Sequence, residues 1–349
     1  MPPADPHPKT SRGNKSGGLT LTDVARIAGV SPISASRALR DPAAVSPALL
    51  DKVRAAVELT GYVPNLVAGG LASNNSKLVA AVVPTIAGPV FQDMVQALTE
   101  TLDGAGYQLM LGQSGYDHSR EDALLDAIIG RRPAGVVLTG IMRSAQARKR
   151  LLNSGIAVVE TWDLTPTPID MLAGFSHEQI GAAVAQFLHR RGRRRVASIS
   201  GADERSKRRL QAFADTAAVL GLMKDGETAV PVRLVPAPTT LASGRRGLAE
   251  LLERHGDIDA VFCSSDLLAL GVLIEAQARG IAVPGQLAVV GFGDLDFARD
   301  LQPPLTTVRI DGAAIGRTAA GFILDRNGGR PILEPVRDLG FSIVERDSA

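Results

Sequence analysis

The chain has 349 residues, which at about 150 residues per domain predicts two domains and a smaller remainder. Apolar residues make up 45%, charged residues 21% and aromatic residues 4%. This composition is typical of a globular protein and excludes a fully disordered or fibrous chain. The one cysteine, Cys263, excludes an intrachain disulfide and a multi-cysteine metal site, and indicates a reducing compartment.

No segment of the sequence has the pattern of a membrane span or a secretion signal. The longest apolar run, residues 78–91, is broken by Pro84 and Pro89. Residues 1–18 are rich in proline and glycine and lack the apolar core of about 7 to 15 residues that a signal peptide needs. We therefore expect a soluble, cytoplasmic protein that begins with a disordered tail.

The formal net charge of +2 is unevenly distributed along the chain. Residues 1–76 carry eight basic and five acidic side chains, a net charge of +3, and the remaining residues carry a net charge of −1. A basic end on a nearly neutral body favours a polyanionic partner, although a charge of this size also arises by chance.

Three short helices are predicted directly after the tail, because hydroxyl residues that cap helices and glycines that end them recur there. The expected helices are 23–28, capped by Thr22 and ended by Gly29; 32 to about 39, capped by Ser31; and 47–60, capped by Ser46 and ended by Gly61. The apolar residues spaced to share one small core are Val24, Ala28, Val30, Ala35, Leu39, Val53 and Val57. A helix, a tight glycine turn and a second helix form a helix-turn-helix, and a three-helix module for protein contacts is the alternative.

The second of these helices is a candidate for reading DNA. Its N-terminal residues would face base edges in the major groove. Ser34, Ser36 and Arg37 are the polar candidates on this helix, and Ser31 can contact a phosphate through its hydroxyl or the helix start.

Several motifs in the same order resemble the LacI/GalR family of bacterial transcription regulators. Residues 19–31 and 34–37 closely resemble that family's headpiece, and residues 61–65 and 71–72 resemble its junction and hinge. The similarity extends over the body through three further motifs, at residues 262–266, 289–292 and 303–308. It covers about residues 19 to 341.

The resemblance implies roles in DNA binding for the headpiece. Pro32, Ile33 and Arg37 occupy the base-reading positions. Pro32 and Ile33 offer no side-chain hydrogen bonds, so we expect apolar contacts there, for example with thymine methyl groups. The residues implied to support or contact the DNA backbone are Thr20, Leu21, Thr22, Ser31, Ser34, Tyr62 and Asn65.

The resemblance also implies that residues 65–76 form a hinge, in which Ala68 and Leu71 are the DNA-binding candidates. Leu71 matches the leucine that inserts into a central base step from the minor groove; an ordinary linker residue is the alternative. Gly69 and Gly70 each disfavour a helix by up to about 1 kcal/mol relative to alanine. We therefore expect a hinge that is disordered without DNA.

From residue 77 onward, strand-like and helix-like segments alternate, which predicts an α/β body with parallel sheets. The expected strands are 78–83, 107–111, 135–138, 157–160, 171–175, 196–200, 260–263 and 287–292. The expected helices include 90–103, 176–190, 206–220 and 267–279. The length fits two Rossmann-like halves with a cleft at the carboxyl ends of the strands.

The family resemblance implies the same body in more detail. It is a periplasmic-binding-protein-like domain, residues 77–349, which binds an effector and forms the dimer. Its two subdomains exchange strands several times, one comprising about residues 77–172 plus 308–341 and the other about 173–307.

The sequence favours a binding protein over an enzyme. It has no glycine-rich dinucleotide motif after a strand, no phosphate loop and no nucleophile elbow. The five histidines show no metal-ligand spacing, and Cys263, inside an apolar strand, is interpreted as a core residue rather than a nucleophile. No cofactor is expected.

A segment rich in basic residues, 205–209, follows the predicted strand 196–200 and is the first candidate for ligand binding. It includes Arg205 and Arg209, and the resemblance implies that Arg209 holds a sugar-type ligand; a solvated helix face is the alternative. An arginine can bind a carboxylate through two hydrogen bonds, which a neutral sugar does not require. The other candidates for the lining are Thr85, Phe91, Glu160, Trp162, Phe175, Ser265, Asp266 and Asp294.

Some of these candidates depart from the family pattern or have two interpretations. Many relatives that bind sugars carry the acid of Asp294 one residue earlier, and they often have asparagine where this chain has Ser265. Trp162 and Phe175 could stack on a ligand ring or fill the core.

Short strings near residues 158–160, 174–175, 203–205 and 338–341 are most similar to the gluconate-operon repressors of the family. We therefore expect a homodimeric repressor that binds a palindromic DNA operator and a small sugar or sugar acid such as gluconate. The alternatives are a sugar-binding protein of a transport system and a nucleotide-using enzyme.

Overall fold

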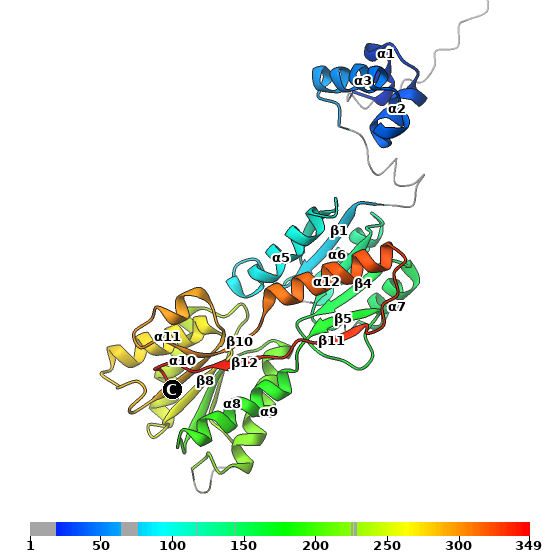
Figure 1. Ribbon diagram of the computed structural model, residues 1–349. Helices are drawn as coiled ribbons and strands as arrows, with labels where there is room; N and C mark the ends of the chain where they lie inside the picture. The colour runs from blue at the N-terminus through cyan, green and yellow to red at the C-terminus, as the bar shows by residue number, and fades with distance from the viewer. Residues whose placement is uncertain (1–18, 64–75, 117, 143, 225, 227–228) are drawn as a thin grey trace, which may run out of the picture. The chain divides into compact units, whose positions relative to one another are not determined.

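The structure is a computed structural model that describes residues 19–63, 76–116, 118–142, 144–224, 226 and 229–349. The chain divides at Asn74 into two compact units, a head and a body (Figure 1). The predicted tail and almost all of the predicted hinge lie outside the described residues, and with them three DNA-binding candidates, Asn65, Ala68 and Leu71.

The head contains the three helices that the cap signals predict. They are α1 (Leu21–Ala28), α2 (Pro32–Arg40) and α3 (Pro47–Thr60), with a short 3-10 turn, η1 (Pro42–Ala44), between the last two. The side chains of Ser31 and Ser46 cap α2 and α3. Gly29 and Gly61 end α1 and α3 in the left-handed conformation.

The first helix starts two residues earlier than Thr22 predicts. Its N-cap is Thr20, whose hydroxyl accepts a hydrogen bond from the Asp23 backbone N–H, while the Asp23 carboxylate accepts one from the Thr20 N–H. These two bonds form a capping box, which satisfies donors at both positions. Thr22 instead lies exposed in the first turn, and Leu21 packs against the core of the head.

Small side chains dominate the core of the head. Ala25, Ala35, Ala38 and Val53 are buried together, and the half-buried residues that pack around them include Val30 and Leu39. Ala25 and Ala38 were not among the predicted core residues. Because alanine side chains are short, they allow three brief helices to approach closely around a small centre.

The body consists of two lobes, each built on a six-stranded sheet. The first sheet has the strand order β11-β5-β4-β3-β1-β2, and each neighbouring pair of strands is parallel. Its strands are β1 (Leu78–Val83), β2 (Gln108–Gln113), β3 (Gly135–Thr139), β4 (Ala157–Thr161), β5 (Met171–Gly174) and β11 (Val336–Asp338). Its helices are α5 (Gln92–Asp103), preceded by the turn η2 (Pro89–Phe91), α6 (His118–Ile129), α7 (Ala145–Ser154) and α12 (Gly312–Asn327).

The second sheet has the order β12-β10-β9-β8-β6-β7, in which only β12 runs antiparallel to its neighbour. Its strands are β6 (Val196–Gly201), β7 (Val232–Val235), β8 (Ala260–Cys263), β9 (Ala288–Gly293), β10 (Thr306–Arg309) and β12 (Ser342–Val344). Its helices are α8 (His177–Arg190), α9 (Glu204–Val219), α10 (Leu241–Arg254), α11 (Asp266–Ala278) and the turn η3 (Asp296–Arg299).

Helices cover both faces of each sheet, so the alternate strand residues that point to opposite faces are all buried. In β1, Val79 and Ala81 pack in a cluster with α5 and α12, whereas Ala80 and Val82 pack in a cluster with α6 and α7. A strand buried on both faces has a continuous apolar sequence, which is the pattern that identifies parallel strands.

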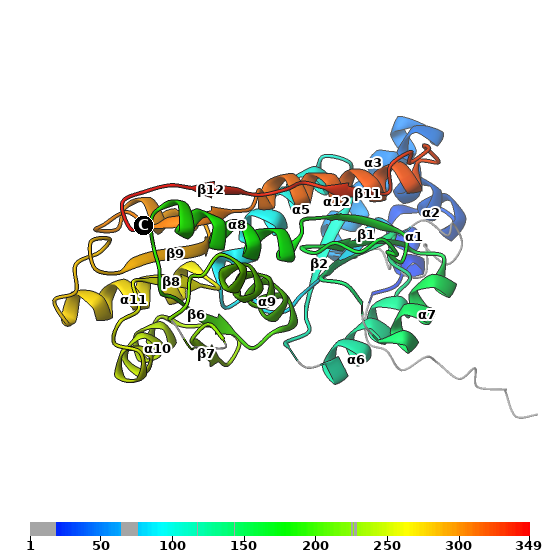
Figure 2. The same ribbon diagram turned by 90° about the horizontal axis from the view of Figure 1, so that it is seen from below.

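The chain passes between the lobes three times, after β5, after β10 and after β11. Figure 2 shows the segment of β11 and β12 running along both lobes. β10 extends to Arg309 within the second sheet, so the second passage falls slightly later than the residue 308 that the sequence suggests. The final residues also join the second lobe, where the Ser348 hydroxyl bonds to the Val289 carbonyl oxygen.

Each strand that the sequence predicts is present within one or two residues of its expected ends. The strands not anticipated, β7, β10, β11 and β12, have three or four residues each. No helix within the described ranges is long and apolar enough to cross a membrane.

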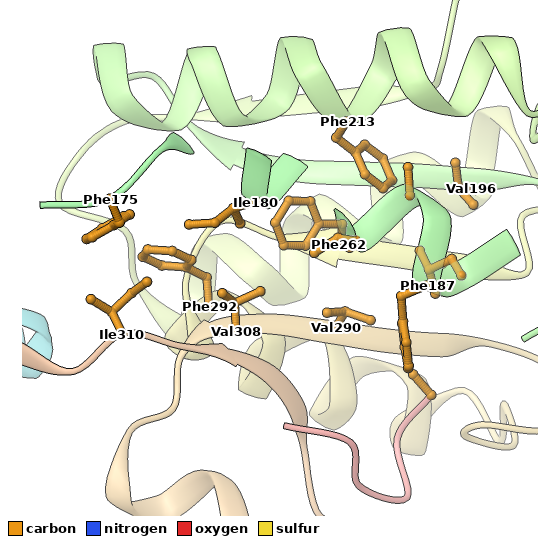
Figure 3. Packing of buried hydrophobic residues seen from close by; sticks show 14 of the residues in the cluster. Phe175, Ile180, Phe187, Val196, Phe213, Phe262, Val290, Phe292, Val308 and Ile310 are labelled. Atoms are coloured by element: carbon orange, nitrogen blue, oxygen red, sulfur yellow. The ribbon is translucent and has the colours of Figure 1, made fainter. Parts of the chain in front are cut away.

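Close contact between α8 and α9 positions the ligand-binding candidates of the second lobe. Figure 3 shows the aromatic and aliphatic side chains that fill the core of this lobe, among them Phe213 and Phe262. A methyl group on Gly181 of α8 would overlap the Arg209 carbonyl oxygen and the Phe213 backbone nitrogen of α9. Only glycine therefore permits this helix spacing.

We expect Gly181→Ala to destabilise the body by about 1 to 3 kcal/mol, because the added methyl group must push α8 and α9 apart. A lower midpoint of thermal unfolding measures this effect. The matched control is Gly321→Ala in α12, where an added methyl group meets nothing within 4 Å. It should raise stability by about 0.5 to 1 kcal/mol. Equal midpoints for the two variants would contradict the packing argument.

Candidate functional site

A cleft lies between the two lobes of the body at the carboxyl ends of the strands of both sheets. Its empty volume is about 770 Å³, which includes space open to solvent. Residues that follow β1, β2 and β4 line one side, and residues that follow β6, β7, β8 and β9 line the other. Carboxyl ends of parallel strands are the usual location of ligand sites in α/β folds.

Six of the ten predicted effector-binding residues line this cleft. They are Thr85, Phe91, Trp162, Arg205, Arg209 and Ser265. They come from strand ends that are far apart in the sequence, and the two facing sheets bring them together. The remaining four, Glu160, Phe175, Asp266 and Asp294, lie outside the lining.

Arg209 is a buried cation in the wall of the cleft, with 3% of its surface exposed. One guanidinium nitrogen lies 2.8 Å from His177 Nδ1, and the other donates to the Ser264 carbonyl oxygen at 3.1 Å. The guanidinium carbon lies 3.8 Å from the centre of the Phe292 ring, within the range of a cation–π contact. Arg209 Nε is buried and has no hydrogen-bond partner among the described residues, so this donor is unsatisfied.

Burial lowers the pKa of Arg209 to about 10, although the nearby Asp203 carboxylate opposes this effect. The side chain is therefore still cationic at neutral pH. A buried cation with an unused donor favours an anionic ligand, because a ligand carboxylate supplies both the missing charge and the missing acceptor.

The ring of His177 is fixed in one neutral form by its two partners. A guanidinium only donates hydrogen bonds, so Nδ1 must accept from Arg209. The proton therefore lies on Nε2, which donates to the Trp162 carbonyl oxygen at 3.1 Å. Burial, followed by the charge of Arg209, holds the pKa of His177 well below its usual value.

The charged residues of the lining leave a net positive charge. They are Arg205 and Arg209 against the single carboxylate Asp203. Burial raises the pKa of Asp203, but the charge of Arg205 and the hydrogen bonds from Ser206 outweigh it, so this pKa lies below its usual value. Asp203 is thus ionised at neutral pH, and one arginine remains uncompensated within the lining.

Hydroxyl groups and aromatic rings complete the lining. Ser265 and Thr239 lie with their hydroxyl oxygens 2.9 Å apart, and Thr85 is on the facing lobe. Burial raises the pKa of Tyr116, so its phenol stays protonated and can donate. The ring of Trp162 packs edge-on against Phe91 at 5.0 Å. Such a wall can hydrogen-bond hydroxyl groups and contact the apolar face of a sugar ring.

Three polar contacts join the lobes beside the cleft. His177 of the second lobe bonds to the main chain of Trp162 in the first. Arg205 donates to the Thr139 carbonyl oxygen at 3.4 Å, and Arg208 forms an ion pair with the buried Asp163. The basic run therefore faces the opposite lobe as well as the cleft, which is not the arrangement of a solvated helix face.

Glu160 and Phe175 do not line the cleft, because the fold uses both of them internally. The two carboxylate oxygens of Glu160 each accept a backbone N–H at 2.8 Å, from Met142 and Ile169, and its side chain is fully buried. The ring of Phe175 is also fully buried, packed between Trp162 and Phe292. Figure 3 shows Phe175 beside Phe292 in the core.

Asp266 also lies outside the lining because its carboxylate already has protein partners. It accepts from the Thr307 hydroxyl at 2.6 Å and from the Leu295 N–H at 2.8 Å. Burial raises the pKa of Asp266 to about 6. The carboxylate thus organises the ends of β9 and β10 rather than facing a ligand.

Asp294 has the same kind of internal role. Arg309 and Arg346 pair with its carboxylate at 2.6 and 2.7 Å, and 8% of its side chain is exposed. Arg309 donates a hydrogen bond to Oδ2, whereas Oδ1 is close to Arg346 but accepts no hydrogen bond among the described residues, so ion pairs within the lobe hold this carboxylate.

Sequence analysis missed several lining residues, including Tyr116, His177, Asp203, Ser206 and Phe292. For two of them, Asp203 and Ser206, the sequence contains a signal. They form a helix cap directly after β6, in which the Asp203 side chain accepts a hydrogen bond from the Ser206 N–H at the start of α9. A capped helix start after a parallel strand marks the edge where ligands bind.

The interpretation of Cys263 as a core residue agrees with its position. It is fully buried in β8, and burial raises the pKa of its thiol. Within the described ranges, no group of three or more histidine, cysteine, aspartate or glutamate residues could hold a metal ion.

The head presents a second candidate surface at the start of α2. Ser31, Pro32, Ile33 and Arg37 are exposed there, and 75% of the Ile33 surface is accessible. Ser34 and Ser36 are half-buried; the Ser34 backbone N–H donates to the Ser31 hydroxyl, which caps the helix. Thr20 and Thr22 are exposed, whereas Leu21 and Tyr62 are half-buried. An exposed helix start with one arginine and an apolar side chain fits a major groove.

Two family profiles match the chain. Residues 20–65 match bacterial regulatory proteins of the lacI family, and residues 185–349 match a periplasmic binding protein-like domain. Among curated proteins, the HTH-type transcriptional regulator GntR of Pseudomonas aeruginosa is 38% identical over 94% of this chain and 95% of its own length. The HTH-type transcriptional repressor CytR of Escherichia coli is 29% identical over 94% and 96%.

Solved structures agree with these matches. A LacI-family transcriptional regulator from Silicibacter pomeroyi has a TM-score of 0.88 and 32% identity, covering 95% of this chain and 99% of that one. The lac repressor dimer bound to operator and an anti-inducer has a TM-score of 0.79 at 22% identity, with coverages of 95% and 99%, which shows the shared fold. From its headpiece, its body and these similarities over nearly its whole length, the chain belongs to the lacI family of bacterial transcriptional regulators.

Proposed function

We propose that this regulator is a cytoplasmic repressor that binds a palindromic operator and is controlled by a small anionic effector, a sugar acid. The observation that carries the effector class is the buried Arg209, which lines the cleft with an unused donor and a neutral histidine beside it. The aromatic and hydroxyl groups around it fit the rest of a sugar-derived molecule.

The charge of the cleft favours an acid over a neutral sugar. Arg205 and Arg209 face one ionised carboxylate, Asp203, so a neutral ligand would leave a buried cation without a matching anion. The short strings near residues 158–160 and 203–205, which resemble the gluconate-operon repressors of the family, are in keeping with this choice. We therefore favour gluconate or a similar sugar acid.

The head is proposed to bind DNA through α2, with Arg37 contacting a base and Ile33 contacting an apolar base edge. The lac repressor, which shares this fold, was solved as a dimer bound to its operator. A dimer of this chain would place two heads on the two halves of a palindrome. Effector binding would act by changing lobe closure, and hence operator affinity.

The body is proposed to act by binding, without catalysis. Among the described residues of the cleft, no serine, cysteine or aspartate is paired with a free histidine base, since His177 is already bonded through both ring nitrogens. The headpiece opposes the alternative of a sugar-binding transport protein, because such a protein has no use for a DNA-binding unit.

We expect Arg37→Ala to reduce discrimination between the operator and random DNA by about tenfold to a hundredfold, as for one lost base contact. The operator is first obtained by selecting from a random DNA pool with the purified protein, and affinities are then measured at physiological salt. The control is Arg54→Ala on α3, which removes the same charge from an exposed position. An equal loss for both variants would show that Arg37 contributes charge only.

We expect the protein to bind D-gluconate and not D-glucose, and Arg209→Met to weaken gluconate binding by about tenfold to a hundredfold through loss of a charged hydrogen bond. Isothermal titration calorimetry measures both affinities, and circular dichroism checks that the variant is folded. Lys207→Met is the control, because Lys207 pairs with Glu204 outside the lining. Equal affinity for the neutral sugar would refute the proposed anionic effector.

A further inference from the structure

His177 occupies an unusual place in the body. It is the first residue of α8, directly after the first passage of the chain between the lobes, and 2% of its surface is exposed. Its ring packs against Phe175 at 5.0 Å. Sequence analysis assigned it no role, and a buried histidine with two committed nitrogens is not a general base.

The two nitrogens of this ring face opposite parts of the site. Nδ1 accepts from Arg209, which lines the cleft, and Nε2 donates to the Trp162 carbonyl oxygen of the other lobe. One rigid aromatic ring therefore spans from the ligand-facing arginine to the opposing lobe. The two bonds require the same tautomer, so each favours the other.

Burial and, after it, the charges around the ring keep it in this neutral form. The groups that act on it are Arg209, Arg205 and Arg208, all cationic, together with the Trp162 carbonyl. Protonation of Nδ1 would place a donor against the donor of Arg209 and a positive charge among three others. The ring is thus held as an acceptor toward Arg209.

The residue on the far side is itself conformationally constrained. Trp162 has a φ of 60°, in the left-handed region that tryptophan rarely adopts. Its indole N–H points to the Met94 sulfur at 3.0 Å. The carbonyl oxygen that accepts from His177 therefore belongs to a residue whose backbone and side chain are both restricted.

We propose that His177 is a positioning residue that couples the orientation of Arg209 to the contact between the lobes, an inference that rests on the proposed effector site. When the lobes separate, the hydrogen bond from Nε2–H to the Trp162 oxygen breaks. The ring is then no longer fixed with Nδ1 toward Arg209. A ligand that binds Arg209 in its present orientation favours the contact between the lobes. By linkage, the contact favours the ligand to the same extent.

Two substitutions separate the two ends of the ring. In His177→Asn, the amide oxygen lies near the place of Nδ1 and can still accept from Arg209, but no atom reaches the Trp162 oxygen. In His177→Gln, the amide nitrogen lies near the place of Nε2 and can donate to that oxygen, but no acceptor faces Arg209. His189→Asn, at the other end of α8, is the matched control.

The contact between the lobes has a direct reporter, because Trp162 is the only tryptophan of the chain. It is 4% exposed, so acrylamide should quench its fluorescence poorly when the lobes are in contact. The degree of quenching without ligand reports whether the lobe contact at Trp162 is intact. The affinity for D-gluconate, measured by calorimetric titration, reports whether Arg209 keeps the orientation that binds the ligand.

We expect His177→Asn to raise acrylamide quenching of Trp162 and to reduce gluconate affinity by only about threefold, because the lobe contact that favours the ligand is weakened while Arg209 keeps its acceptor. We expect His177→Gln to keep low quenching and to lose about tenfold in affinity, as for a misplaced charged hydrogen bond. The control should match the unsubstituted protein in both measurements. Loss of both properties in both variants would mean that His177 is only structural, and no change in either variant would mean that it has no role.

A test without ligand keeps this inference separate from the proposed effector class. In the folded protein, magnetic resonance of the labelled histidine rings should show His177 with its proton on Nε2. In Arg209→Met its pKa should rise, because one of the cations that lower it is gone. If gluconate does not bind, the effector class is wrong, and the ring measurement and the quenching comparison still decide the role of His177. A proton on Nδ1 instead of Nε2 in the unsubstituted protein would overturn the inference.

Discussion

The burial of one guanidinium constrains the ligand-binding half of this regulator. Arg209 is held by the Phe292 ring, the Ser264 carbonyl oxygen and the His177 ring. An unpaired charge buried in protein is strongly unfavourable, so these partners stabilise the lobe with the cation inside. The absence of a side chain at Gly181 is part of the same constraint, since it allows α8 to carry His177 close to α9.

This arrangement depends on the exchange of strands between the lobes. Trp162 follows a strand of the first sheet, whereas His177 begins a helix of the second, and they are joined by the short chain through β5. Because three passages of the chain link the lobes, the facing edges of the two sheets meet across the cleft, where strand ends present their side chains. Contacts such as Arg208 with Asp163 then form across the boundary rather than within one lobe.

Much of the fold could be predicted from local patterns in the sequence. The serine-proline starts of α2 and α3 specify helix caps through short-range geometry, and continuous apolar segments specify strands buried on both faces. Thr22, taken alone, predicts a cap for α1 two residues too late, whereas the spacing of Thr20 and Asp23 makes a reciprocal pair. Short strands such as β11 and β12 have no recognisable sequence pattern, because they form only by pairing with strands far away in the sequence.

The site was predicted less completely, for a physical reason that Glu160 and Asp266 illustrate. A carboxylate near a strand end has the right chemistry for a ligand, but nearby backbone N–H groups or hydroxyls can satisfy it first, as they do for both residues. Sequence position does not reveal which polar groups already have partners. Arg209 remains a ligand-binding candidate because its acceptors are a histidine nitrogen, a carbonyl oxygen and a serine hydroxyl, none of which neutralises its charge. The uncompensated charge, more than the number of polar groups, therefore distinguishes a residue prepared for an anion from one that completes the fold.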